Sequence, residues 1–452
     1  MQPPEEMLLA PADRAQLRRR AAELAPLGAL AGPAADDPQS RAVLDELAAR
    51  LGDTYPYQDW HYAGQMLKPP HPVAWAAYAL TMLLNPNNHA LDGGPATARM
   101  EREAVALLAR MLLGREEHLG HLTTGGTVAN LEALFVAREE RPGARVVSGA
   151  GAHYTHARMC ALLGVEHRAL AQDAAGRMDL DALEAELRRG GVGTVVATAG
   201  TTSLGALDPV GEIAGLCAEH GARLHVDAAY GGFFALLADG GDPSVARAPF
   251  AAIARADSVV IDPHKHGLQP YGCGCVVFAD PAVGRHYVHD SPYTYFTSDA
   301  LHLGEISLEC SRAGAAAAAL WATLRRFPLA REGLGTTLAA AREAALELAG
   351  RLRGAGHELV VEPELDILCP FPRRARASAV SEACEAAFER LAAQGIHVAK
   401  LRVETAWLRR SHPWLEDDAP TVTTLRHCLM KPGHADHCAE LADAIGAALA
   451  QA

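Results

Sequence analysis

The stretch Ser258-Val259-Val260-Ile261-Asp262-Pro263-His264-Lys265-His266 places a lysine between two histidines, just after a short apolar run. The apolar run predicts a buried strand, and the polar residues after it predict the start of an active-site loop. Lysine is rare here, because only four of the 41 lysines and arginines are lysine: Lys68, Lys265, Lys400 and Lys431. An amine held among cationic or desolvating groups can lose its proton and attack a carbonyl, which a guanidinium cannot do. Lys265 is therefore the candidate nucleophile.

A second apolar run lies upstream and ends at a carboxylate. The segment Leu224-His225-Val226-Asp227-Ala228-Ala229-Tyr230-Gly231-Gly232 predicts a buried strand that stops at Asp227. A buried carboxylate is costly unless a cation or a hydrogen-bond donor pairs with it. A protonated pyridine nitrogen would be such a partner, and the small residues after Asp227 leave room for a flat ring.

A glycine-containing turn precedes a helical pattern earlier in the chain. Its sequence is Thr123-Thr124-Gly125-Gly126-Thr127-Val128-Ala129-Asn130, and Leu131 to Phe135 continue as a helix. Glycines allow close backbone approach, and the first amides of a helix bind anions. We expect this turn to hold a phosphate through Gly126, Thr127 and Thr124.

Together, and in the order in which they occur from the N-terminus to the C-terminus, these motifs resemble those of the pyridoxal-phosphate-dependent group II amino acid decarboxylases, which include glutamate, aromatic amino acid, tyrosine and diaminobutyrate decarboxylases. The resemblance extends from about residue 55 to the C-terminus. It implies pyridoxal 5'-phosphate as the cofactor and the type I fold of PLP-dependent transferases. It also implies a homodimer with active sites near the subunit interface, and decarboxylation of an L-amino acid to an amine and CO2.

The resemblance assigns the cofactor site to nine residues: Lys265, Asp227, Ala229, His153, Gly126, Thr127, Thr124, Thr202 and His264. Lys265 would hold the cofactor as an internal aldimine, which the substrate converts to an external aldimine. Asp227 would pair with the pyridinium nitrogen, while His153 and Ala229 would lie against the ring. Thr202 would lie near the ring and the substrate carboxylate, and His264 would assist at the phosphate or in proton transfer. A surface or capping role is the alternative for His153.

Substrate recognition is expected from two other regions. The segment from Tyr55 to Pro72 is rich in aromatic residues and proline, and its Gln65 and Lys68 are candidate pocket residues, with a structural loop as the alternative. Arg426 matches a family arginine that can reach a substrate carboxylate, although a solubilising edge-strand arginine is equally compatible. Lys68 and Arg426 favour an acidic substrate, whereas the aromatic cluster favours a tyrosine-like one.

The segment Tyr287 to Gly304 is irregular and is interpreted as a loop that closes over the substrate. Tyr293 and Tyr295 are its candidate catalytic residues, because a phenol stays protonated in a dry site and can act as a general acid toward the α-carbon. The sequence leaves open which tyrosine is used.

Alternating strand-like and helical segments predict an α/β fold, with a mostly parallel sheet flanked by helices. We expect an N-terminal helical arm at residues 1–60, a large PLP-binding domain at residues 61–330 and a small C-terminal α+β domain at residues 331–452. The arm contains two amphipathic stretches, for which a partner subunit and the rest of the same chain are alternative packing surfaces.

Composition excludes several other classes. The chain has 452 residues and a net charge of −13 without a basic block, which disfavours nucleic acid and anionic membranes as partners. We find neither a signal-peptide pattern nor an apolar run of membrane-spanning length, and we expect a cytoplasmic protein. The nine cysteines suggest neither a disulfide framework nor a metal site.

Two alternatives to an amine-forming decarboxylase remain open from the sequence. A carbon–carbon lyase or an aldehyde-forming decarboxylase could use the same cofactor site, because the site alone does not choose which bond breaks. A catalytically silent binding protein with the same fold is disfavoured by intact Lys265, Asp227 and His153.

Overall fold

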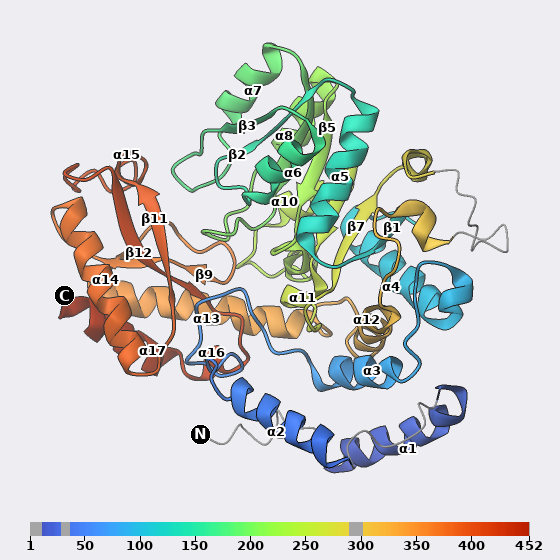
Figure 1. Ribbon diagram of the computed structural model, residues 1–452. Coiled ribbons are helices and arrows are strands. Elements are labelled where there is room, and N and C mark those ends of the chain that lie inside the picture. The colour runs from blue at the N-terminus through green and yellow to red at the C-terminus, as the bar shows by residue number, and fades with distance from the viewer. Residues whose placement is uncertain (1–10, 29–36, 289–301, 452) are drawn as a thin grey trace.

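The computed structural model describes residues 11–28, 37–288 and 302–451. Figure 1 shows a large domain around a central sheet, a smaller domain beside it and a helical arm that runs along one side of both. The expected α/β architecture is confirmed, whereas the domain boundaries at residues 60 and 330 stay predictions.

The large domain contains a seven-stranded sheet in the order β1-β7-β6-β5-β4-β2-β3. Four neighbouring pairs are parallel, and β7 is antiparallel to both β1 and β6. The central strands read as continuous Val-rich runs because both of their faces are buried, as in other parallel sheets. The strands are β1 (Leu119–Thr123), β2 (Arg145–Gly149), β3 (His167–Leu170), β4 (Val192–Thr198), β5 (Arg223–Asp227), β6 (Ser258–Ile261) and β7 (Gly274–Phe278).

The helices of the large domain pack against this sheet or against one another (Figure 1). They are α3 (Pro72–Met82), α4 (Pro95–Leu113), α5 (Gly126–Glu140), α6 (Thr155–Leu163), α7 (Leu180–Arg188), α8 (Val210–His220), α9 (Ala235–Asp239), α10 (Arg247–Ala252), α11 (Pro263–His266) and α12 (Gly314–Arg326). Short 3-10 helices lie at Leu91–Gly93, Gly232–Phe234, Ile253–Arg255, Pro281–His286 and Leu303–Ile306.

The small domain packs helices against short antiparallel strands, as expected for an α+β unit. One sheet has the order β11-β12-β9, and β8 pairs with β10. The strands are β8 (His357–Leu359), β9 (Ile367–Leu368), β10 (Pro370–Pro372), β11 (Ala399–Glu404) and β12 (Thr421–Cys428). The helices are α13 (Gly335–Gly354), α14 (Ala377–Ala393), α15 (Thr405–Leu408), α16 (Gly433–Asp436) and α17 (Cys438–Ala450).

The N-terminal arm consists of α1 (Pro11–Gly28) and α2 (Pro38–Leu51). Asp37 caps the N-terminus of α2, and its side chain accepts a hydrogen bond from the Ser40 amide. No residue of α2 is buried, although the helix carries several aliphatic side chains. Among the described residues, no helix is long and apolar enough to cross a membrane.

Candidate active site

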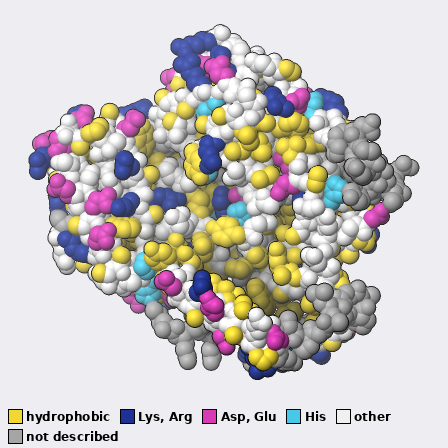
Figure 2. All heavy atoms as spheres, viewed as in Figure 1, with side chains coloured by type: hydrophobic (Ala, Val, Ile, Leu, Met, Phe, Trp, Pro, Cys, Tyr) yellow, Lys and Arg dark blue, Asp and Glu magenta, His cyan; other side chains and the backbone are white. Residues whose placement is uncertain are grey.

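The carboxyl ends of four strands bring the motif residues together. Because β1, β4, β5 and β6 run in the same direction, the segments that follow them meet at one edge of the sheet, where open α/β sheets bind ligands. These segments and residues 153–155 line a cavity of about 350 Å³, which is the size of a small-molecule site. Figure 2 shows the molecule hollowed between the two domains, with basic, acidic and histidine side chains in the hollow.

Asp227 ends β5 and is 95% buried. Its Oδ2 lies 2.9 Å from Nε2 of His156, and its Oδ1 accepts a hydrogen bond of 3.1 Å from the Ala229 amide. Burial alone would raise the pKa of Asp227, but the hydrogen bond from His156 and the charges of His156 and Lys265 hold this pKa well below its usual range. Asp227 is therefore an ionised carboxylate in a largely dry site, as a partner of a cationic ring nitrogen must be.

Lys265 lies in the single turn of α11, directly after β6. Its Nζ is 3.0 Å from Oδ2 of Asp262, and 19% of its side chain is exposed. Burial lowers the pKa of Lys265, but the charges of Asp262 and Asp227 outweigh it and raise the pKa. The amine is thus held as an ammonium between two carboxylates.

The ion pair between Lys265 and Asp262 requires a glycine at position 126. A Cβ added at Gly126 would lie 2.6 Å from Oδ2 of Asp262, so any larger residue would displace the carboxylate. The close approach of the glycine turn to Asp262 places the first turn of α5 beside Lys265.

The first turn of α5 is anchored by a buried chain of polar side chains. Nδ2 of Asn130 donates to the Gly126 carbonyl at 2.9 Å, and Oδ1 of Asn130 lies 2.8 Å from Nε2 of His225. Nδ1 of His225 lies 2.9 Å from the hydroxyl of Ser258. This chain links α5, β5 and β6, so the helix N-terminus is fixed relative to Asp227 and Lys265.

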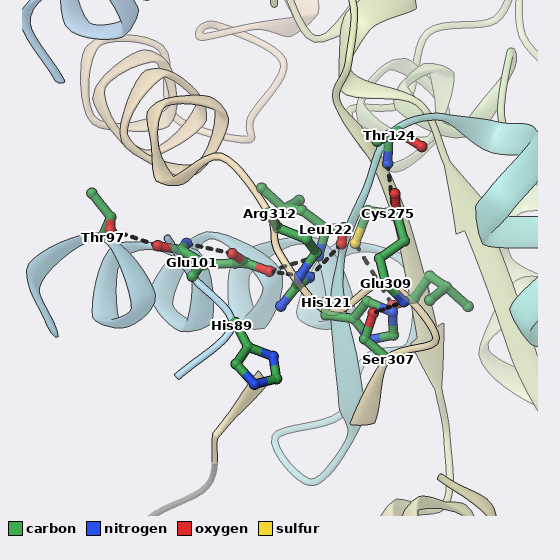
Figure 3. Close-up of polar contacts among 12 residues, drawn as sticks. His89, Thr97, Glu101, His121, Leu122, Thr124, Cys275, Ser307, Glu309 and Arg312 are labelled. Atoms are coloured by element: carbon green, nitrogen blue, oxygen red, sulfur yellow. Dashed lines mark hydrogen bonds and ion pairs between the residues drawn. The ribbon is translucent and has the colours of Figure 1, made fainter. Parts of the chain in front are cut away.

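A second polar network fixes the end of β1, as Figure 3 shows. The Arg312 guanidinium donates to the Leu122 carbonyl at 2.6 Å and to Oε1 of Glu101 at 3.0 Å, and the same Glu101 oxygen accepts from the Leu122 amide. Farther along, Oε2 of Glu309 accepts a 3.1 Å hydrogen bond from the Thr124 amide. The amide of Thr124 is therefore used within the protein, whereas Gly126 and Thr127 begin α5, where amides lack helical acceptors.

His153 lines the cavity next to Asp227 and is partly buried. Its Nδ1 accepts a 3.2 Å hydrogen bond from the Thr155 amide, which orients the ring. Burial lowers the pKa of His153, and the opposing charge of Asp227 does not overcome this effect. The imidazole is therefore neutral near pH 7, as a ring that stacks on a cofactor and accepts a proton should be.

The residues of the cavity fit pyridoxal phosphate. Among the described residues, Oγ1 of Thr198, Oδ1 of Asp262 and Nδ1 of His264 are buried without a hydrogen-bond partner, and all three residues line the cavity. A site with orphaned polar atoms is built for a polar ligand. The helix N-terminus suits the phosphate, the Asp227 carboxylate suits the ring nitrogen and the Lys265 amine suits the aldehyde.

All nine residues that the sequence assigns to the cofactor site line this one cavity: Lys265, Asp227, Ala229, His153, Gly126, Thr127, Thr124, Thr202 and His264. Their roles toward the cofactor stay predictions. Tyr293 and Tyr295 lie outside the described residues. His156, Asp262, Asn130 and Glu309 were not assigned from the sequence. The spacing of Asp262 three residues before Lys265 could have indicated their contact, because the two share one helical turn.

The three candidate substrate residues do not line the cavity. Gln65 is exposed, and Lys68 is buried beside a second cavity of about 940 Å³. Arg426 donates to the carbonyls of Gly64, Thr202 and Ser203, with 2.6 Å for the bond to Thr202. In this structure Arg426 therefore holds the loop that carries Thr202.

Comparisons with known proteins agree with this geometry. A family model described as the pyridoxal-dependent decarboxylase conserved domain matches residues 59–371. A probable L-tyrosine/L-aspartate decarboxylase of Methanothermobacter thermautotrophicus is 31% identical over 69% of this chain and 83% of its own length. A probable L-aspartate decarboxylase of Halobacterium salinarum is 36% identical over 67% of this chain and 80% of its own length. The solved structure of Oryza sativa TDC with PLP and tryptamine aligns with a TM-score of 0.79, at 20% identity over 97% of this chain and 98% of that one, which shows a shared fold.

Proposed function

The chain belongs to the family of pyridoxal-dependent decarboxylases, and from this premise we propose that it converts an L-amino acid to the corresponding amine and CO2 with Lys265, Asp227 and His153 as catalytic residues. The main support for this proposal is that all three side chains line the same cavity. When bound, pyridoxal phosphate supplies an electron sink for the bond that breaks.

Lys265 would hold the cofactor through its amine, and Asp262 orients that amine across 3.0 Å. Asp227 remains ionised and would keep a proton on the ring nitrogen, while His156 orients the carboxylate through its contact with Oδ2. Ala229 and His153 confine the ring, and the amides of Gly126 and Thr127 hold the phosphate. Thr202 and His264 complete the lining of the cavity.

Return of a proton to the α-carbon completes the reaction. Tyr293 or Tyr295 is the predicted donor, with His153 as the alternative. His153 is suited to this step because it lines the cavity and is neutral, so it can take up a proton and release it.

L-Aspartate is the substrate that we propose first. Aspartate is named for both relatives described above, and tyrosine is named for one of them. Lys68 and Arg426 do not line the cavity, and their contact with a substrate carboxylate stays a prediction. The proposal therefore rests on the relatives.

We expect purified protein with pyridoxal phosphate to release CO2 faster from L-aspartate than from L-tyrosine or L-2,4-diaminobutyrate. The measurement is CO2 release across an amino acid panel, with mass spectrometry of the products. Faster release from tyrosine would reject the acidic substrate. Aldehyde in place of amine would indicate the aldehyde-forming reaction, cleavage without CO2 would indicate a lyase, and no turnover of any amino acid would indicate a silent protein.

We also propose that the protein is a homodimer, because α2 presents an exposed apolar stripe. Val43, Leu44, Leu47 and Leu51 share one face of this helix and are 49–64% exposed. A helix with such a face needs a surface on which to pack, and a second copy of the chain would provide it.

Light scattering should give about twice the 47.7 kDa mass of one chain. The double variant Leu44→Glu/Leu47→Glu should shift the protein toward monomer, because it buries two charges in the interface. Ala49→Glu is the control, since Ala49 lies on the opposite face of α2 and is exposed. A monomeric wild-type protein would contradict the proposal.

A further inference from the structure

Asp366 of the small domain contacts both segments that carry catalytic residues. It directly precedes β9, and its side chain is fully buried. The Tyr230 hydroxyl donates to Oδ1 of Asp366 at 2.6 Å, and Nε2 of His266 lies 3.3 Å from Oδ2. Tyr230 follows Asp227 by three residues and His266 follows Lys265 directly, so one carboxylate joins the two halves of the site.

The rings of Tyr230 and His266 also touch each other. Their centroids are 4.9 Å apart at an interplanar angle of 66°, in an edge-to-face arrangement. Tyr230 lines the cofactor cavity, whereas His266 is completely buried behind it. A shift of the Asp366 carboxylate would therefore be transmitted to the wall of the cavity.

Positive charges surround Asp366 from several elements. Lys68 and Lys431 are 96% and 98% buried, and among the described residues neither Nζ has a hydrogen-bond partner. Arg342 faces Asp366 from α13, but its guanidinium donates to backbone carbonyls. The other titratable groups near Asp366 are Tyr230, His266, Arg426 and Cys428.

A buried cluster of this kind is not needed for stability alone. Removing charges from water costs several kcal/mol per ion, and well-packed apolar residues are often as stable. Since the cluster lies against Tyr230 and the helix of Lys265, its position indicates a role in arranging the site.

Resting on the proposed function, we propose that Asp366 is a positioning residue for decarboxylation. Its carboxylate is hydrogen-bonded to Tyr230, lies against His266 and belongs to a buried cluster that includes Lys68 and Lys431, and it thereby sets the relative positions of Asp227 and Lys265.

The charge of Asp366 should change within the working pH range. Burial raises the pKa of Asp366 to about 6, while the Tyr230 hydrogen bond and the charge of Lys68 oppose this shift. Burial lowers the pKa of Lys68 to about 8, against the charge of Asp366. Between about pH 6 and pH 8 the carboxylate is ionised and Lys68 is still charged. Below pH 6 the carboxyl is protonated and no longer attracts the amine.

The experiment compares the pH profile of kcat/KM for four variants. Asp366→Asn should abolish the fall in kcat/KM below about pH 6, which is the acid limb of the profile. It should also lower kcat by about ten- to a hundredfold, because small misplacements of catalytic groups slow the reaction. Tyr230→Phe and Lys68→Met should each move the acid limb to higher pH, since each removes a group that lowers the Asp366 pKa. Lys400→Met is the matched control, because Lys400 is a partly exposed lysine paired with Glu385, and it should change neither limb.

A second measurement is independent of turnover. The midpoint of the pH-dependent change in the visible absorbance of bound pyridoxal phosphate should shift in Asp366→Asn and not in Lys400→Met. If wild type releases no CO2 from any amino acid, the proposed function fails, and this midpoint still tests the role of Asp366.

An unchanged acid limb and an unchanged midpoint in Asp366→Asn would overturn the proposal. If Asp366→Asn does not fold, as judged by circular dichroism, the pH profiles of Tyr230→Phe and Lys68→Met test the proposal instead. An acid limb that is unshifted in both variants would overturn the proposal.

Discussion

Lys265→Ala is expected to lose covalent cofactor attachment and to decrease decarboxylation by roughly 10⁴-fold or more, as occurs when other enzymes lose a nucleophile. The physical reason is that the Lys265 amine lines the cofactor cavity and is a primary amine that can bond to an aldehyde. Borohydride reduction of the wild-type protein, followed by proteolysis and mass spectrometry, should give one labelled peptide that contains Lys265.

The other three lysines provide the comparison. Lys68 and Lys431 are buried outside the cofactor cavity, and Lys400 pairs with Glu385 on the surface. Lys400→Ala should retain the label and the activity. A labelled peptide containing Lys68, Lys400 or Lys431 would show that the nucleophile has been assigned to the wrong residue.

Asp227→Ala should fold and bind the cofactor but lose turnover by about 10²- to 10³-fold, the size of effect seen when one electrostatic contact to a transition state is removed. The carboxylate is 95% buried and bonded to His156, so its negative charge acts in a low dielectric at short range. Without it, the charge on the cofactor ring nitrogen would have no partner.

Steady-state kinetics measures the loss of kcat, and a titration of the protein with cofactor, followed by absorbance, measures the loss of cofactor affinity. The kcat of Asp227→Ala should fall far more than its cofactor affinity. Asp239→Ala is the control, since Asp239 is an exposed acid at the end of α9. An Asp227→Ala enzyme with near wild-type kcat would remove Asp227 from the mechanism.

Strands with continuous apolar runs could be predicted from the sequence, because burial on both faces leaves a local signature. The segment Ser258–Ile261 is of this kind, and its prediction as a buried strand is confirmed. Strand β1 was missed because it contains His121, a buried residue whose Nε2 lies 3.0 Å from Glu132 of α5. Edge strand β3 was missed because His167, Arg168 and Ala169 are not buried.

The sequence alone determined the family, the cofactor and nine of the residues that line the cavity, because each motif is a short segment at the end of a strand. Only the tertiary structure decided the contacts between segments. His156 and Asp227 are 71 residues apart, and Tyr230 and Asp366 are 136 apart. The local amino-acid sequence does not predict such pairs, because the partner of a side chain depends on how the strands are ordered and on how the small domain packs. For the same reason, the packing of Arg426 against the Thr202 loop could not be anticipated from its place in a strand.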